Sequence, residues 1–152
     1  MLVILFKAGE DLFAMDVREL LEIVPSFELR QVPGVASGVA GIMRYRDGSI
    51  PVLDLGILIG GDPCQSRLST RILVVRYRAG SAEEKLGLRV ESATETLKID
   101  LDNLQTPGVT SPDAAFLGQV FQHESGLVQL VGVEHLLSET LAATLYTEVR
   151  AQ

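Results

Sequence analysis

The residues of this chain that could bind a metal or activate a nucleophile are few and scattered. The candidate soft ligands are Cys64, His123 and His135, and they follow neither CxxC nor HxxxH spacing. Ser125 lies two residues after His123, but side chains so close on a turn cannot converge as a catalytic triad requires. We therefore expect no catalytic residue, no metal and no cofactor.

Asp54 stands in the run VLDLG, which partly matches the apolar-apolar-Asp-Thr/Ser-Gly motif of aspartic proteases. Leu55 replaces the hydroxyl residue of that motif. A second, similar run has Gly132 where a second aspartate would be needed to share a proton. We expect Asp54 instead to end a strand and to accept hydrogen bonds from backbone donors of the following turn.

The chain is acidic, with a formal net charge of −7. A negative field disfavours nonspecific binding to nucleic acid or to an anionic membrane. Arg71, Arg76 and Arg78 form a local basic stripe, but acidic residues lie nearby and Tyr77 is the single aromatic residue among the three arginines, which falls short of the alternation typical of nucleic-acid binding. We interpret the stripe as a solvated face and expect no nucleic-acid partner.

Targeting and redox signals are also absent from the sequence. No apolar run approaches the roughly 20 residues of a membrane helix, and the N-terminal residues lack the basic region of a signal peptide. Cys64 is the single cysteine, so an intrachain disulfide is impossible. We expect a cytoplasmic protein without direct membrane insertion.

The sequence repeats itself: residues 118–137 resemble residues 41–59 once Ser125 is treated as an insertion. Gly41 aligns with Gly118, and Gly48 aligns with Gly126. Each copy predicts a strand, a polar turn with glycine, a second strand and a short apolar helical turn. The spacing is too long for a solenoid, which indicates two similar β lobes within one domain of residues 1–152.

The remaining patterns predict a mainly β fold of about ten short strands. Polar residues 60–70 are predicted to link the two lobes. Leu137, Leu141 and Leu145 form one stripe of an amphipathic C-terminal helix at residues 138–150. Pro51 lacks a backbone donor and is therefore expected at a sheet edge or bulge.

Four motifs in this order resemble the CheW-like family of chemosensory coupling proteins. The central run GIMRYRDGSIPVLDL at residues 41–55 is the most specific of them. Asp47 follows Arg46 where the family has glycine, and Glu91 replaces the usual aspartate. The other three motifs lie at residues 6–23, 87–95 and 127–137.

The resemblance implies two intertwined SH3-like five-stranded β-barrels with a short C-terminal helix, and no catalysis. It implies an adaptor that joins the cytoplasmic helical hairpin of a chemoreceptor to the regulatory domain of a CheA-type histidine kinase. The receptor helix is expected in an apolar groove between the barrels, and the isolated protein is expected to be a monomer.

Four site residues carry over from the family motifs. Leu20, Glu22 and Arg46 match positions on the receptor side, and Glu22 and Arg46 are expected to pair across strands. Gly41 matches a position where either kinase contact or barrel packing requires the absence of a side chain. The sequence leaves these two interpretations of Gly41 open.

Other functions stay open beside the receptor–kinase adaptor. A CheW-like module could act in type IV pilus control, in a Wsp-type surface-sensing pathway or as a decoy scaffold. A subunit that assembles through its β edges is another alternative. A small hydrolase or metal enzyme is disfavoured because no His, Asp and Cys residues converge in the sequence.

Overall fold

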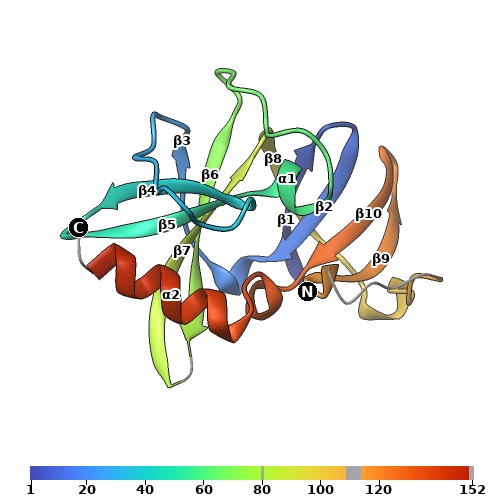
Figure 1. Cartoon of the computed structure of the whole chain (residues 1–152). Helices are drawn as coiled ribbons and strands as arrows, with labels where there is room; N and C mark the ends of the chain where they lie inside the picture. The colour runs from blue at the N-terminus through green and yellow to red at the C-terminus, as the bar shows by residue number, and fades with distance from the viewer. Residues whose placement is uncertain (80, 109–113, 151–152) are drawn as a thin grey trace.

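The fold consists of two five-stranded sheets and a C-terminal helix (Figure 1). Each sheet is mixed, with antiparallel and parallel strand pairs. The computed structural model describes residues 1–79, 81–108 and 114–150. Lobe A is the sheet of β1 (Leu2–Ala8), β2 (Asp11–Asp16), β8 (Ser92–Lys98), β9 (Leu117–His123) and β10 (Gly126–Val131). Lobe B is the sheet of β3 (Leu20–Pro25), β4 (Val39–Tyr45), β5 (Gly48–Asp54), β6 (Arg71–Ala79) and β7 (Ala82–Val90).

Short helical elements connect these strands. Helix α1 (Leu55–Leu58) follows β5, and the 3-10 turns η1 (Val17–Glu19) and η4 (Val133–His135) follow β2 and β10. A further 3-10 turn, η2 (Leu101–Asn103), follows β8, and helix α2 (Glu139–Arg150) ends the described chain. No helix in residues 1–79, 81–108 and 114–150 is long and apolar enough to span a membrane.

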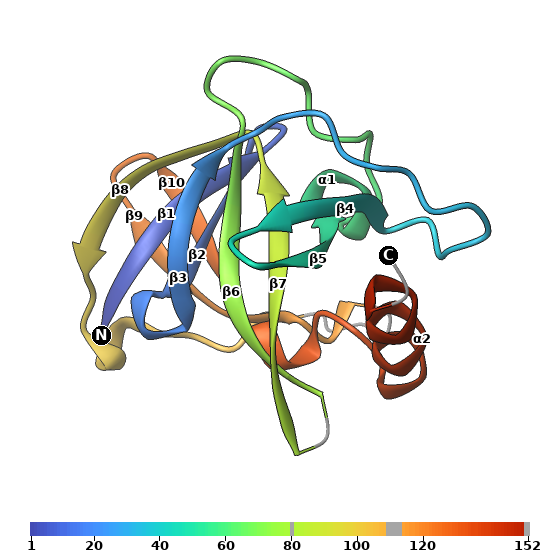
Figure 2. The same cartoon turned by 90° about the vertical axis from the view of Figure 1, so that its left-hand side faces the viewer.

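The two sheets have equivalent strand orders, β8-β1-β2-β10-β9 and β3-β6-β7-β5-β4. Each sheet combines a hairpin from one repeat with three strands from the other, once each repeat is extended to include the strands that precede it, as residues 1–59 and residues 71–137. β3 pairs with β6 and β8 pairs with β1, as Figure 2 shows, while β5 and β10 run parallel to β7 and β2. The predicted pair of intertwined five-stranded lobes is therefore confirmed.

The strand order corrects the predicted role of residues 60–70. This segment joins α1 to β6, and β5 and β6 both belong to lobe B. The chain instead crosses between the lobes at η1 and at Glu91. Residues 60–70 do separate the two sequence repeats, but because the repeats exchange strands, the boundary between repeats is not the boundary between lobes.

Each sheet curls until its two edge strands meet, as an SH3-like barrel requires. In lobe B, Glu22 on edge strand β3 contacts Tyr45 on edge strand β4. In lobe A, Glu95 on edge strand β8 lies 3.9 Å from His123 on edge strand β9, measured between Oε1 and Nε2. Isolated bridges from Arg30 to Ile42 and from Gln105 to Val120 also cover the outer edges of β4 and β9.

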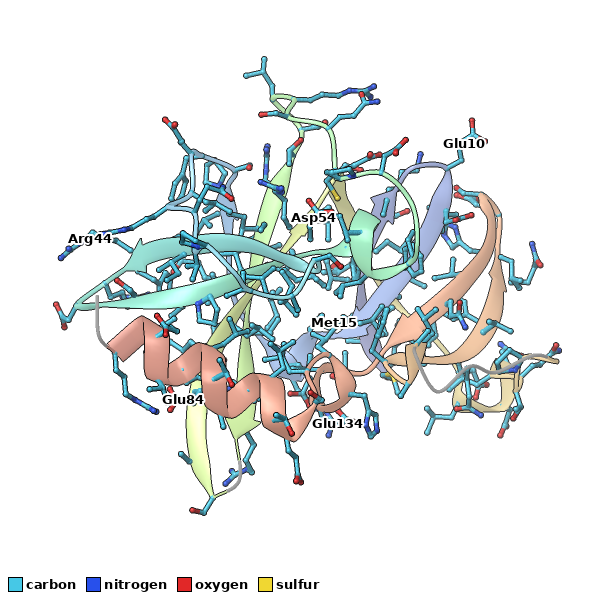
Figure 3. All side chains as sticks on the ribbon, viewed as in Figure 1. Glu10, Met15, Arg44, Asp54, Glu84 and Glu134 are labelled. Carbon is cyan, nitrogen blue, oxygen red and sulfur yellow. The ribbon has the colours of Figure 1, made fainter. Side chains whose placement is uncertain are left out.

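The largest hydrophobic cluster contains buried side chains of both lobes and of α2. Phe6 and Met15 of lobe A lie in it with Leu73 and Leu88 of lobe B and Leu145 of α2. Met15 is visible at the centre of Figure 3, between the lobes and above α2. Because the lobes share this core, we expect them to fold as one unit.

Helix α2 packs on its own domain. Its Ala142, Leu145, Tyr146 and Val149 side chains are buried, and the Tyr146 hydroxyl donates to the Lys85 carbonyl at 2.9 Å. Ser138 Oγ accepts a hydrogen bond from the Leu141 N–H at 3.1 Å and so caps the first turn.

Asp54 is completely buried at the end of β5, beside α1 (Figure 3). Its Oδ2 accepts hydrogen bonds from Arg89 Nε at 2.9 Å, and Arg89 Nη2 lies 2.8 Å away. Its Oδ1 accepts from the Ile57 N–H and the Cys64 N–H, each at 3.1 Å. The carboxylate thus caps α1, as the sequence predicted, and also fixes the loop at Cys64 and the parallel neighbour β7.

Gly41 is buried where no side chain can fit. Its φ is +153°, and an added Cβ would lie 2.7 Å from the carbonyl oxygen of Arg30. Arg30 forms an isolated bridge with Ile42 at the outer edge of β4. Packing of this bridge against β4 accounts for the glycine.

Pro51 does not lie on an edge strand, which was one of the two predicted positions, because β5 is flanked by β4 and β7. The other predicted position, a bulge, lies next to it, since the β4–β5 register shifts between Val39 and Gly41, opposite Val52 and Leu53. Its partner on β4 is Ile42, whose N–H and C=O both bond to Arg30 instead. The parallel pairing with β7 begins only at Val52. Pro51 therefore occupies a position where neither neighbour requires its missing donor.

Replacing Asp54 by asparagine should destabilise the protein by about 3 kcal/mol, because Arg89 keeps its charge and loses its partner in the interior. Chemical denaturation measures this loss. The matched control is Glu83→Gln, which breaks the exposed Arg76–Glu83 pair and should cost at most about 1 kcal/mol. Equal losses in the two variants would contradict the role assigned to Asp54.

Gly41→Ala should destabilise the fold by about 2 kcal/mol, because the new methyl group meets backbone atoms that cannot move away. Gly48→Ala is the control, since an added Cβ there meets nothing within 4 Å. Thermal unfolding of both variants should show a large decrease for the first and a change within about 0.5 kcal/mol for the second.

Candidate functional site

The side chains considered for catalysis or metal binding lie apart in the structure. Cys64 is buried, and its thiol donates to the Arg89 carbonyl at 3.4 Å. Burial, and then the nearby Asp54 carboxylate, raise the pKa of this thiol to about 12, so it stays protonated and is a poor nucleophile. Within the described parts of the chain, no three His, Cys, Asp or Glu side chains are grouped to hold a metal ion.

The two histidines have local partners. His135 is exposed and lies 3.7 Å from Glu134, measured between Nε2 and Oε1. His123 Nδ1 accepts a hydrogen bond from the backbone N–H of Ser125 at 3.3 Å. His123 therefore fixes the turn backbone, and this hydrogen bond does not involve the Ser125 hydroxyl.

The clearest polar arrangement at the surface is the lobe B seam, which we define as Glu22, Tyr45 and Arg46. Glu22 Oε1 accepts a hydrogen bond from the Tyr45 hydroxyl at 2.7 Å and from Arg46 Nη2 at 3.2 Å. The Glu22 side chain is 41% exposed and that of Arg46 68% exposed. The predicted pairing of Glu22 with Arg46 is thus present, and both charges are accessible to a partner.

Arg46 adopts a backbone conformation that usually belongs to glycine. Tyr45 pairs with Gly48, so the β4–β5 turn contains only Arg46 and Asp47, and the φ of Arg46 is +54°. A non-glycine residue is strained there. The structure needs no glycine at Asp47, because the positive φ falls one residue earlier.

Arg46 is held over the ring of Tyr45, with its Cζ atom 5.2 Å from the ring centroid. The Lys85 ammonium lies 5.9 Å from the same centroid. Tyr45 first, and Glu22 after it, raise the pKa of the Arg46 guanidinium above its usual value. Arg46 therefore keeps its positive charge throughout the physiological pH range.

Lobe A contains a counterpart of this arrangement, the lobe A seam, which consists of Glu95 and His123. The sequence repeat aligns His123 with Arg46. Glu95 lies on β8, the edge strand equivalent to β3, which carries Glu22. Both barrels thus close through an acid on the edge strand and a basic residue at the end of a hairpin strand.

The structure brings together only two of the four predicted site residues. Leu20 is half-buried and packs against the large shared core, and a register shift in β3 separates it from Glu22. Gly41 is buried and explained by packing. Sequence reasoning missed Tyr45, which adjoins Arg46, because the contact between edge strands β3 and β4 cannot be read from local pattern.

A groove lies on lobe A beside Ile59 at the end of α1, and because no strand of lobe B lines it, it is not the groove between the barrels that the family resemblance implied. It has a volume of about 500 Å³, and its lining includes Leu12, Ile59 and Leu117. Glu10 and Asp11 add negative charge to its rim. The lobe B seam does not line this groove, so the two features are separate surfaces.

The two lobes also differ in charge. Residues 20–90, which contain every strand of lobe B, carry nine Lys or Arg against seven Asp or Glu, a net charge of +2. Residues 1–19 and 91–138, which contain lobe A, carry three against eleven, a net charge of −8. Two barrels of like topology therefore present opposite fields.

Known proteins that are similar to this chain include two chemotaxis proteins and a protein named PilI. The chain is 24% identical over 135 residues to the chemotaxis protein CheW of Helicobacter pylori, covering 88% of this chain and 79% of that protein. It is 23% identical over 139 residues to the probable chemotaxis protein CheW of Rhizobium etli, covering 90% and 87%. It is 26% identical over 121 residues to the protein PilI of Pseudomonas aeruginosa, covering 78% and 66%.

A solved structure shares the fold. The crystal structure of the scaffolding protein TtCheW from Thermoanaerobacter tengcongensis superposes with a TM-score of 0.81 at 24% identity, covering 90% of this chain and 87% of that chain. The family model described as the CheW-like domain matches residues 2–141. Because this match spans nearly the whole sequence, the chain belongs to the CheW-like domain family.

Proposed function

We propose that this protein is a non-catalytic adaptor in a chemosensory two-component pathway. It links the cytoplasmic helical hairpin of a chemoreceptor to the regulatory domain of a histidine kinase. The observation that carries this function is the family match over residues 2–141, and two relatives named chemotaxis proteins support it. The scattered positions of Cys64, His123 and His135 favour binding over catalysis.

The shape and charge of the two lobes suit a bridging role. The shared core fixes lobe A and lobe B relative to each other, and their net charges of −8 and +2 favour different partners. Electrostatic complementarity of this kind selects partners and speeds association. A monomer can then hold a receptor and a kinase on separate surfaces, in the cytoplasm where a receptor hairpin and a kinase would meet.

We assign the receptor contact to the side of lobe B that carries the seam. Ile23 on β3 and Phe27 after it expose 38% and 47% of their surface, so this edge of lobe B offers apolar area as well as a charged pair. The strain at Arg46 supports a role in recognition, since strained residues persist where the surroundings or the function require them. Leu20 contributes mainly through packing beneath this surface.

A second proposal concerns the pathway in which the protein acts, and in it the protein is still an adaptor. The similarity to the protein PilI favours a related module in type IV pilus control, and surface sensing or a decoy scaffold would use the same surfaces. Recovery of the cognate kinase and receptor from the protein's own cells, identified by mass spectrometry, distinguishes these pathways.

Arg46→Glu should weaken binding to a receptor hairpin fragment by at least about tenfold, because it places two like charges at the seam and reverses the field that meets the partner. Isothermal titration calorimetry measures the affinity, and circular dichroism checks that the fold is intact. An unchanged affinity in a folded variant would rule out the seam as the receptor contact.

Two variants control this experiment. Glu95→Gln alters the equivalent acid in lobe A and should leave receptor affinity unchanged. The exchange Glu22→Arg with Arg46→Glu restores an attractive pair in reversed order. It should recover the stability of the fold but not the receptor affinity, because the partner still meets the reversed charges.

A further inference from the structure

Tyr45 contacts both charged side chains of the lobe B seam and lies close to Lys85 as well. Its hydroxyl donates to Glu22 Oε1 at 2.7 Å, the Arg46 guanidinium lies 5.2 Å from its ring centroid, and the Lys85 ammonium lies 5.9 Å from it. The Tyr45 residue is only 9% exposed and belongs to the inner cluster of lobe B. Tyr45 thus connects the rigid interior of the barrel to charges at its surface.

Without this contact, Glu22 and Arg46 would not be held in one geometry. Glu22 and Arg46 are both substantially exposed. In exposed ion pairs, water weakens the attraction between the two charges, and side-chain entropy opposes a single fixed geometry. A tyrosine anchored by packing offers a donor in a fixed place at small entropic cost. The carboxylate that accepts from it is therefore restrained before any partner arrives.

The arrangement also leaves binding capacity on Glu22. Both donors converge on Oε1, and within residues 1–79, 81–108 and 114–150 no hydrogen bond reaches Oε2. An ionised carboxylate accepts several hydrogen bonds. The oriented Oε2 and the remaining N–H groups of Arg46 then stand side by side as one acceptor and several donors.

We propose that Tyr45 is a positioning residue that sets the specificity of the receptor contact by fixing the Glu22 carboxylate and the Arg46 guanidinium in one geometry. This inference rests on the proposed receptor contact at the seam. Tyr45 acts through Glu22 and Arg46. Preorganising charged groups raises affinity because less ordering remains to be done on binding.

Tyr45→Phe tests this proposal, because it keeps the buried ring and removes only the hydroxyl. Affinity for the receptor hairpin fragment should fall by about three- to tenfold, because the Glu22 carboxylate must then be ordered when the partner binds. In a Glu22→Gln background the same change should have no further effect, since the carboxylate it positions is gone. Calorimetry on the four proteins of this double-mutant cycle gives the coupling directly.

Tyr77→Phe is the matched control. Tyr77 is another buried tyrosine of lobe B, and its hydroxyl donates to the Leu137 carbonyl at 3.3 Å, away from the seam. This variant should lose stability without losing receptor affinity. A nitrogen-edited NMR spectrum adds a measurement that needs no receptor. The Arg46 side-chain Nε–H group should show restricted motion in the parent protein and motional averaging in Tyr45→Phe.

The outcomes separate this proposal from the function on which it rests. Loss of affinity in Tyr45→Phe that vanishes in the Glu22→Gln background supports it. Unchanged affinity in Tyr45→Phe, while Arg46→Glu binds weakly, overturns the role of Tyr45 and retains the receptor contact. Unchanged affinity in both variants overturns the receptor contact and the specificity role together.

Discussion

The buried ion pair between Asp54 and Arg89 is the constraint on which lobe B depends. Asp54 ends a strand of the first repeat and Arg89 lies in register on a strand of the second. The same carboxylate caps α1 and holds the returning loop at Cys64. Burying a charge is costly unless it is paired and fully hydrogen-bonded, and at this position four donors satisfy it. In lobe A, the aligned Gly132 forms no such cap.

The exchange of strands between repeats explains why the two lobes form one unit. β3 pairs with β6 and β8 pairs with β1, so each of these strands pairs with a strand of the other repeat, and the largest core cluster draws on both lobes. Neither lobe can complete its sheet from one repeat alone. An adaptor gains from this, since two partners held on separate lobes are kept at a fixed distance and orientation.

Much of the fold follows from local pattern. The hairpin with a polar turn before Gly48, the cap by Asp54 and the amphipathic C-terminal helix each depend on residues close in sequence, and each is present in the structure, although the turn itself consists of Arg46 and Asp47. The position of residues 60–70 within lobe B and that of Pro51 on an inner strand do not follow, because strand exchange is decided by pairing between distant segments. For the same reason, Arg89 could not be predicted as the partner of Asp54 from the sequence.

The residues of the candidate site also differ in whether the sequence alone could predict them. Glu22 and Arg46 could be predicted from family motifs, and Gly41 could be singled out although its role as packing became clear only from the carbonyl of Arg30. Tyr45 could not be predicted, since its contact with Glu22 arises when the edges of lobe B close. The lobe A seam was accessible in principle, because the repeat aligns His123 with Arg46.

The most direct test of the central claim is sedimentation of three purified components: this protein, the receptor hairpin fragment and the kinase regulatory domain from the same cell. The adaptor function predicts a complex that contains all three, and no association of receptor with kinase domain when this protein is left out. Binding of only one partner at a time, or equal association of receptor and kinase domain without this protein, would contradict it.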